Sequence, residues 1–211
     1  MQTNRIVVLA VACILGSGAL AGAAAKPLLV RGSIVSSSPS SFSVKTATGV
    51  VTIAYGAKTA FVGADRGSAA DVVPGAFVGV ANMPGAGASR ALEVSVFDEK
   101  MRGAGEGDGP WDAPATHGSR MTNGTVAQPH AMMTNGTVGA MNGATKTITV
   151  KYKGGSRKIA VTPETPIVRV APGSAKLLAR DASVFVSAQK MPSGLTARFV
   201  VVGKNGTIVP L

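Results

Sequence analysis

An internal repeat constrains the fold of this chain more than any other feature of its sequence. When the sequence is shifted by 106 positions, residues 42–97 align with residues 148–203 without a gap, and sixteen of the 56 aligned pairs are identical. Chance matching in a chain rich in Val, Ala and Gly does not hold one register for so long. Self-similarity at a fixed spacing indicates two copies of one structural unit. We therefore expect two units, at residues 28–97 and 134–204, joined by a linker at 98–133 and followed by a short tail at 205–211.

Within each copy, apolar and polar residues alternate over short stretches. Phe42 and Val44 alternate with Ser43 and Lys45, and residues 148–151 repeat the pattern. A period of two is typical of half-buried strands, and no stretch shows a sustained helical pattern. Five or six short strands can enclose a core of this size by curving into a closed sheet. We predict an all-β fold of two tandem small barrels, similar to OB-folds and joined by the Gly-rich linker; a pair of flat sheets is the competing architecture.

The first 25 residues predict a signal peptide. Arg5 supplies the positive charge, residues 6–15 form an apolar run, and small residues fill positions 16–25. The run is short for a retained span of ~20 residues, and no later segment could cross a bilayer. Lipid attachment at Cys13, the sole cysteine, fits poorly because residues 10–12 are a poor approach to such a site. We therefore expect a periplasmic or secreted protein.

The positive charge of the chain is concentrated in its last third, where residues 146–211 hold 11 basic and 2 acidic residues. Lys151, Lys153, Arg157 and Lys158 flank one predicted hairpin. This face predicts an anionic partner, such as an envelope polymer or lipid head groups, although a row of basic residues is also typical of a solvated strand edge. The aromatic content of 4% and the expected export argue against nucleic acid, because single-strand binders stack bases on aromatic side chains.

The linker contains Trp111, the sole tryptophan, which we expect to pack between the two units rather than to serve as an exposed binding anchor. The glycines at 103, 105, 107 and 109 predict a connector, since a phosphate-binding loop would be followed by a helix. The sequence MTNGTV occurs twice, at 121–126 and 133–138. We expect the second copy to open the second unit as a strand, because Gly136 then aligns with Gly32 of the first unit.

The residues offer little support for catalysis. The two histidines, His117 and His130, both lie in the linker, and the ten carboxylates are scattered without a recognisable acid/base pair. We therefore expect a protein that is not an enzyme. The one cofactor hypothesis is copper, because His130, Met132 and Met133 offer the imidazole and thioether groups that suit Cu(I).

Several stretches of the chain resemble a family of secreted bacterial proteins whose repeated unit is a domain of unknown function. They are RGSIV at 31–35, DVVPG at 71–75, RALEV at 90–94, MRGAGEG and PWD within 101–112, and MTNGTV. Proteins similar to these are sometimes labelled metal ABC transporter permeases, which a chain without further spans does not fit. The resemblance implies export and a tandem small-barrel fold but no activity.

Taken together, the sequence predicts an exported, non-catalytic binding or scaffolding protein that contacts an anionic envelope component or another envelope protein. The alternative is a periplasmic copper-binding protein.

Overall fold

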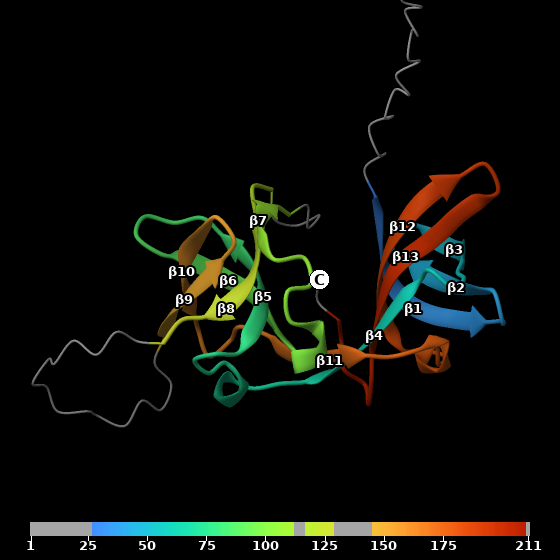
Figure 1. Ribbon diagram of the computed structural model, residues 1–211. Coiled ribbons are helices and arrows are strands. Elements are labelled where there is room, and N and C mark those ends of the chain that lie inside the picture. The colour runs from blue at the N-terminus through green and yellow to red at the C-terminus, as the bar shows by residue number, and fades with distance from the viewer. Residues whose placement is uncertain (1–26, 112–116, 129–144, 210–211) are drawn as a thin grey trace, which may run out of the picture.

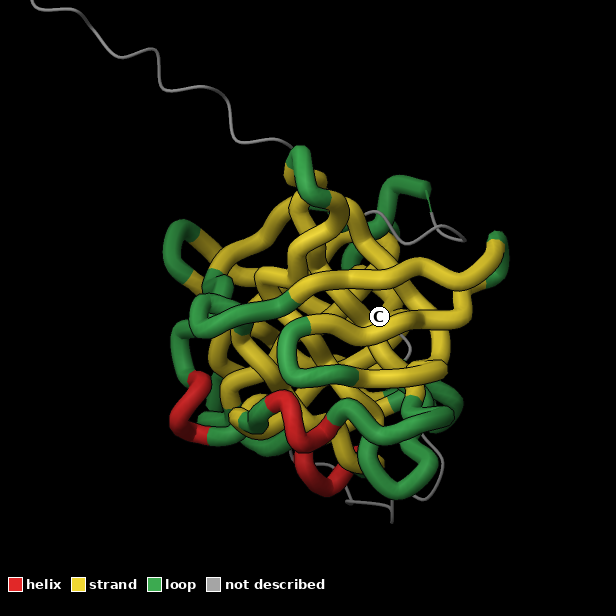
Figure 2. Tube along the Cα trace, turned by 90° about the vertical axis from the view of Figure 1, so that its right-hand side faces the viewer, coloured by secondary structure: helices red, strands yellow, loops and turns green. Residues whose placement is uncertain are grey.

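The computed structural model describes residues 27–111, 117–128 and 145–209. The described chain is all-β, with thirteen strands and three short 3-10 helical turns. Strands predominate in the side view of Figure 2, and the helical turns lie toward its lower side. No helix among the described residues is long and apolar enough to form a membrane span. The elements are β1 (Leu28–Ser37), β2 (Ser41–Thr46), β3 (Gly49–Ala54), β4 (Ala60–Arg66), η1 (Ala69–Asp71), β5 (Phe77–Met83), β6 (Ser89–Phe97), η2 (Glu99–Met101), β7 (Gly107–Pro110), β8 (Arg120–Val126), β9 (Lys146–Tyr152), β10 (Gly155–Val161), β11 (Ile167–Pro172), η3 (Ala175–Leu177), β12 (Ser183–Met191) and β13 (Gly194–Gly203).

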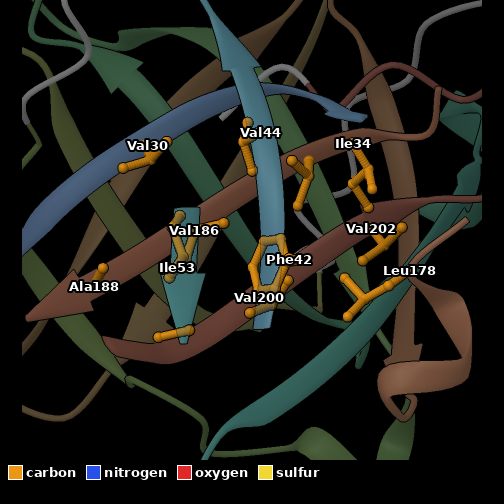
Figure 3. Close-up of a cluster of buried hydrophobic side chains, with 12 residues drawn as sticks. Val30, Ile34, Phe42, Val44, Ile53, Leu178, Val186, Ala188, Val200 and Val202 are labelled. Carbon is orange, nitrogen blue, oxygen red and sulfur yellow. The ribbon is translucent and has the colours of Figure 1, made fainter. Parts of the chain in front are cut away.

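Strands from the two ends of the chain close the first barrel, here called barrel 1. β1, β2 and β3 form an antiparallel meander, β12 pairs with β1, and β13 pairs with β12. A short parallel pairing of β13 with β3 closes the ring. Figure 3 shows side chains of β1, β2 and β3 pointing toward those of β12 and β13. This core contains Val30, Ile34, Phe42, Val44, Ile53, Leu178, Val184, Val186, Ala188, Ala197, Val200 and Val202.

The middle of the chain closes a second ring of the same design, here called barrel 2. β8, β9 and β10 form its meander, β5 pairs with β8 and β6, and a parallel pairing of β10 with β6 closes it. Figure 1 shows barrel 2 on the left, barrel 1 on the right, and β4 and β11 crossing between them. Its core contains Val72, Val78, Val80, Ala91, Val94, Val126, Ile148, Val150, Ile159 and Val161.

The two barrels do not coincide with the two sequence units. Barrel 1 takes its meander from residues 28–97 and its last two strands from residues 134–204. Barrel 2 takes β5 and β6 from residues 28–97 and β9 and β10 from residues 134–204, and its strand β8 comes from the expected linker. The expected separate units at 28–97 and 134–204 are therefore replaced by an exchange of strands. β4 and β11 cause it, because each runs from one barrel to the other and pairs with its counterpart.

The exchange follows a pseudo-two-fold axis that passes through the β4–β11 pair. Ala64 lies opposite Val170, which is its own equivalent 106 positions later. The parallel pairs repeat the symmetry, since Phe61 lies opposite Val200 while Ile167 lies opposite Val94. This self-complementary arrangement is typical of a two-fold dimer, here made within one chain.

The first copy of MTNGTV forms the strand that opens the meander of barrel 2. Thr125 lies opposite Lys151 just as Ser33 lies opposite Lys45. Gly124 is therefore the structural equivalent of Gly32, and both glycines approach a backbone carbonyl so closely that a side chain would clash. The expectation for residues 133–138 was wrong in this respect; that second copy lies outside the described residues.

Candidate functional site

A cavity of about 350 Å³ lies where the two barrels face each other. Its walls come from β5, β6 and β8 of barrel 2 and from β12 and β13 of barrel 1, with residues of β4, β11 and the linker completing the lining. The lining is almost wholly apolar, and pockets of this size and character are typical of small-molecule sites. Its aromatic and thioether side chains are Phe97, Met101, Trp111, Met121, Phe185 and Phe199.

Two equivalent positions of the repeats line this cavity with side chains of very different size. Position 79 on β5 is glycine, whereas its equivalent on β12, Phe185, carries a large ring. A Cβ atom at Gly79 would lie 2.6 Å from the Asn123 Oδ1 atom and 2.9 Å from Cε2 of Phe97. Both neighbours also line the cavity. A bulky residue at position 79 would therefore displace them or occupy the space.

Asp108 fastens the linker to barrel 2. Its side chain is 6% exposed and accepts hydrogen bonds from Arg120 Nε at 2.8 Å, Arg157 Nη2 at 2.7 Å and Thr122 Oγ1 at 2.6 Å. Burial raises the pKa of Asp108, but the hydrogen bonds from Arg120, Arg157 and Thr122 outweigh it and hold that pKa at about 2. Asp108 is therefore ionised at neutral pH and ties β7 to β8 and β10.

Trp111 follows β7 and extends from barrel 2 to barrel 1. Its backbone N–H donates to the Ser119 carbonyl at 2.8 Å, and the Ser119 hydroxyl donates to the Trp111 carbonyl at 2.6 Å. The indole packs against Phe185 of barrel 1, with ring centroids 5.9 Å apart and a tilt of 39°. The ring thus belongs to the apolar cluster between the barrels and forms part of the cavity lining.

Two buried polar atoms of lining residues have no hydrogen-bond partner among the described residues. They are Nε1 of Trp111, a donor, and Oδ1 of Asn123, an acceptor. The Asn123 amide nitrogen donates to the Gly105 carbonyl at 3.0 Å, which fixes the orientation of the amide. An unsatisfied buried group costs about 1–3 kcal/mol. A ligand that bonds to these atoms would remove this cost.

A buried carboxyl lies beside the cavity, on the same face of β6 as the lining residue Ser95. Glu93 on β6 is 3% exposed and accepts a hydrogen bond from Ser95 Oγ at 3.2 Å. Burial raises the pKa of Glu93 to about 8, against the opposing effects of Ser95 and the Arg31 guanidinium. Arg31 on β1 lies 5.0 Å from the ring centroid of Phe185. Ser95 and Phe185 both line the cavity. Glu93 and Arg31 therefore contact lining residues of barrel 2 and barrel 1, respectively.

The predicted basic face is only partly a free surface. Lys151, Lys153 and Lys158 are exposed on the β9–β10 hairpin. Arg157 instead points to Asp108 and also donates to the Ser89 hydroxyl at 3.3 Å. The sequence suggested four equivalent cations, whereas Arg157 is a structural partner of the linker.

The predicted copper ligands His130, Met132 and Met133 lie outside the described residues, so that hypothesis stays a prediction. Among the residues that the structure does describe, no cluster of His, Cys, Asp and Glu could hold a metal ion.

Sequence reasoning singled out Trp111 but missed Gly79, Asn123 and Asp108 as site residues. One signal for Gly79 was available, since the repeat aligns it with Phe185 between matched valines on both sides. No comparable signal existed for Asn123, because its neighbours in space come from the exchange of strands.

Comparison of the chain with models of protein families, with curated proteins and with solved structures gives no match. The cavity and the residues that surround it are therefore the basis on which a function is proposed.

Proposed function

We propose that this protein is an exported, non-catalytic binding protein whose ligand is a small apolar molecule held between its two barrels. One observation carries the proposal: an apolar cavity of about 350 Å³ holds two polar groups, on Trp111 and Asn123, that lack partners among the described residues. Ligand pockets typically combine such apolar walls with a few polar groups that orient the ligand. The N-terminal sequence supports export.

We further propose that each barrel is OB-like. The order of pairings supports this: an antiparallel meander of three strands, a hairpin supplied by the other repeat, and a parallel pairing that closes the ring. OB-folds are five-stranded barrels of Greek-key type that serve as binding modules. A binding role therefore agrees with the proposed architecture.

The proposal is tested by titration with N-phenyl-1-naphthylamine, an uncharged probe whose fluorescence rises in apolar sites. We expect saturable binding to one site, with energy transfer from Trp111, the only tryptophan in the chain. Gly79→Phe should abolish binding because the new ring would fill the cavity. Gly56→Phe is the matched control, since a Cβ atom at Gly56 has no atom within 4 Å.

Equal probe binding by the wild-type protein and a folded Gly79→Phe variant would contradict the proposal. Circular dichroism and thermal unfolding of both variants identify any loss of folding.

A second candidate function is contact with an anionic envelope component. Lys151, Lys153 and Lys158 remain exposed on one hairpin whose strands hold no acidic residue, and the Glu106 carboxylate of the linker accepts a hydrogen bond from the Lys153 backbone N–H at 3.1 Å. Pull-down from an envelope extract should then lose its captured partner at high salt and in the Lys151→Glu/Lys153→Glu variant. Capture that survives both changes would rule out recognition by charge.

A further inference from the structure

We infer that the ligand of the cavity between the barrels is an uncharged ring compound bearing a hydroxyl group, a phenol or a fused-ring analogue. The inference rests on the proposed function, because it names the class of molecule that the same cavity takes. It follows from three properties of the lining: its rings, its lack of charge and its two unpartnered polar atoms.

The rings in the lining favour a flat apolar ligand. Phe185 and Phe199 come from barrel 1, Phe97 comes from barrel 2, and Trp111 comes from the linker. Aromatic pairs gain about 0.5–1.5 kcal/mol beyond the burial of their area. The thioethers of Met101 and Met121 also contact aromatic rings favourably and adapt to irregular shapes. A ring can therefore contact aromatic or thioether groups from both barrels and the linker.

The absence of charge in the lining excludes an ionised ligand. None of the described residues that line the cavity is Asp, Glu, Lys or Arg. A carboxylate or an ammonium group would lose its hydration there without gaining an ion pair, which is costly in an apolar site. Beside the lining residue Ser95, Glu93 is mostly protonated at neutral pH, since burial raises its pKa to about 8. The ligand is therefore neutral when bound.

The two atoms that lack partners among the described residues specify the polar group. Trp111 Nε1 can only donate a hydrogen bond, and the free oxygen of Asn123 can only accept one. A hydroxyl both accepts and donates, so one such group can satisfy both atoms. A ketone would satisfy Trp111 alone. The Asn123 amide nitrogen already donates one of its two N–H groups to the Gly105 carbonyl, so Oδ1 is the amide atom that lacks a partner among the described residues.

Isothermal titration calorimetry at pH 7 with three matched probes tests the inference. The probes are 2-naphthol, naphthalene and 2-naphthoate, which share one ring system and differ in the polar group. We expect 2-naphthol to bind about tenfold more tightly than naphthalene, because it satisfies two buried groups. 2-Naphthoate should bind more weakly than either.

Two variants assign the preference for the hydroxyl to named atoms. Trp111→Phe keeps an aromatic ring but removes the Nε1 donor, and Asn123→Ala removes the acceptor. One of the two hydrogen bonds to the hydroxyl remains in each variant. The dissociation constant of naphthalene should therefore exceed that of 2-naphthol by only roughly threefold. Phe199→Leu is the control, because it should weaken both probes and leave their ratio unchanged.

The outcomes separate the inference from the proposed function. Equal affinity for 2-naphthol and naphthalene, or tightest binding of 2-naphthoate, would overturn the ligand class while leaving the cavity as a binding site. Binding that no Trp111 or Asn123 variant changes would also overturn it. If none of the three probes binds the folded wild-type protein, the proposed function fails together with the inference.

Discussion

Two carboxyl groups of barrel 2 and its linker are held in opposite states of ionisation. Glu93 is 3% exposed and accepts a hydrogen bond from Ser95, and burial raises its pKa to about 8 against the opposing effects of Ser95 and the Arg31 guanidinium. Asp108 is also inaccessible, but two guanidinium groups and a hydroxyl donate to it, and its pKa is about 2. The balance between burial and the neighbouring donors and charges decides the charge state of each group.

Glu93 should make the stability of the protein fall as the pH rises. Its pKa is about 8 in the folded protein and near 4.5 in the unfolded chain, so the folded state holds the extra proton between these values. The favourable contribution is complete below pH 4.5 and is lost as the pH rises through 8. Glu93→Gln cannot ionise and should remove this loss, on the order of 4 kcal/mol between pH 5 and pH 9.

Urea unfolding of the wild-type protein and Glu93→Gln across this range measures the difference. If the two proteins give parallel profiles of unfolding free energy against pH, Glu93 is not the source of the loss of stability at high pH.

Asp108→Asn should destabilise the protein and loosen the linker. The substitution leaves Arg120 and Arg157 near each other without their anion, and we expect a loss of about 2 kcal/mol at pH 7. Because the pKa of Asp108 is lowered from 3.8 to about 2, its contribution is present above pH 3.8 and is lost as the pH falls toward 2. The difference between the variant and the wild type should therefore shrink over that range.

Asp65→Asn provides the matched control for Asp108→Asn. Asp65 pairs with Lys204 at 2.7 Å, but both side chains are substantially exposed, at 33% and 42%. Such a pair contributes about 0–1 kcal/mol. Chemical unfolding that gives equal losses for the two variants would show that Asp108 is an ordinary surface carboxylate.

At the scale of elements, the close approach of β8 to β9 depends on Gly124. A Cβ atom there would lie 2.1 Å from the Lys151 carbonyl oxygen, a backbone atom that cannot move away easily. Gly124→Ala should therefore lower the melting temperature markedly. Gly136→Ala, the same change in the second MTNGTV copy, should have little effect. The opposite ranking would mean that residues 133–138 form the strand.

The alternation of residue types predicted most strands, because a period of two is typical of a strand with one buried face. The stretches at residues 42–45 and 148–151 were both expected as strands and lie in β2 and β9. The choice between the MTNGTV copies was wrong because both carry the same side chains. Only pairing with Lys151 distinguishes them, and pairing is not visible in a single strand's sequence.

At the scale of the molecule, the exchange of strands could not be predicted from the repeat. Val78 and Val184 are equivalent, so either can complete the core of either barrel with the same pattern. The direction that β4 and β11 take decides whether each repeat closes its own barrel or the two repeats exchange strands. Both arrangements bury the same residues. The sequence thus predicted an all-β fold with barrel closure correctly but could not predict which strands share a ring.

The exchange also places the basic residues and the cavity. β9 and β10, which carry Lys151 and Lys158, belong to barrel 2, while β12 and β13 belong to barrel 1. The basic last third of the chain is therefore divided between the barrels rather than gathered in one. Because the strands are exchanged, Gly79 of barrel 2 and Phe185 of barrel 1 line the same cavity. The proposed site therefore depends on the exchange of strands.

Cross-linking with paired cysteines tests the exchange most directly. In a Cys13→Ser background, Ser183→Cys is combined with either Ser33→Cys or Thr125→Cys. Ser33 lies opposite Ser183 on neighbouring strands of barrel 1, whereas Thr125 lies opposite Phe77 in barrel 2. Directly opposed residues meet the short Cα separation that a disulfide requires. Mass spectrometry of the oxidised, folded proteins should find the 33–183 disulfide and no 125–183 disulfide; efficient formation of 125–183 with none at 33–183 would mean that each repeat closes its own barrel.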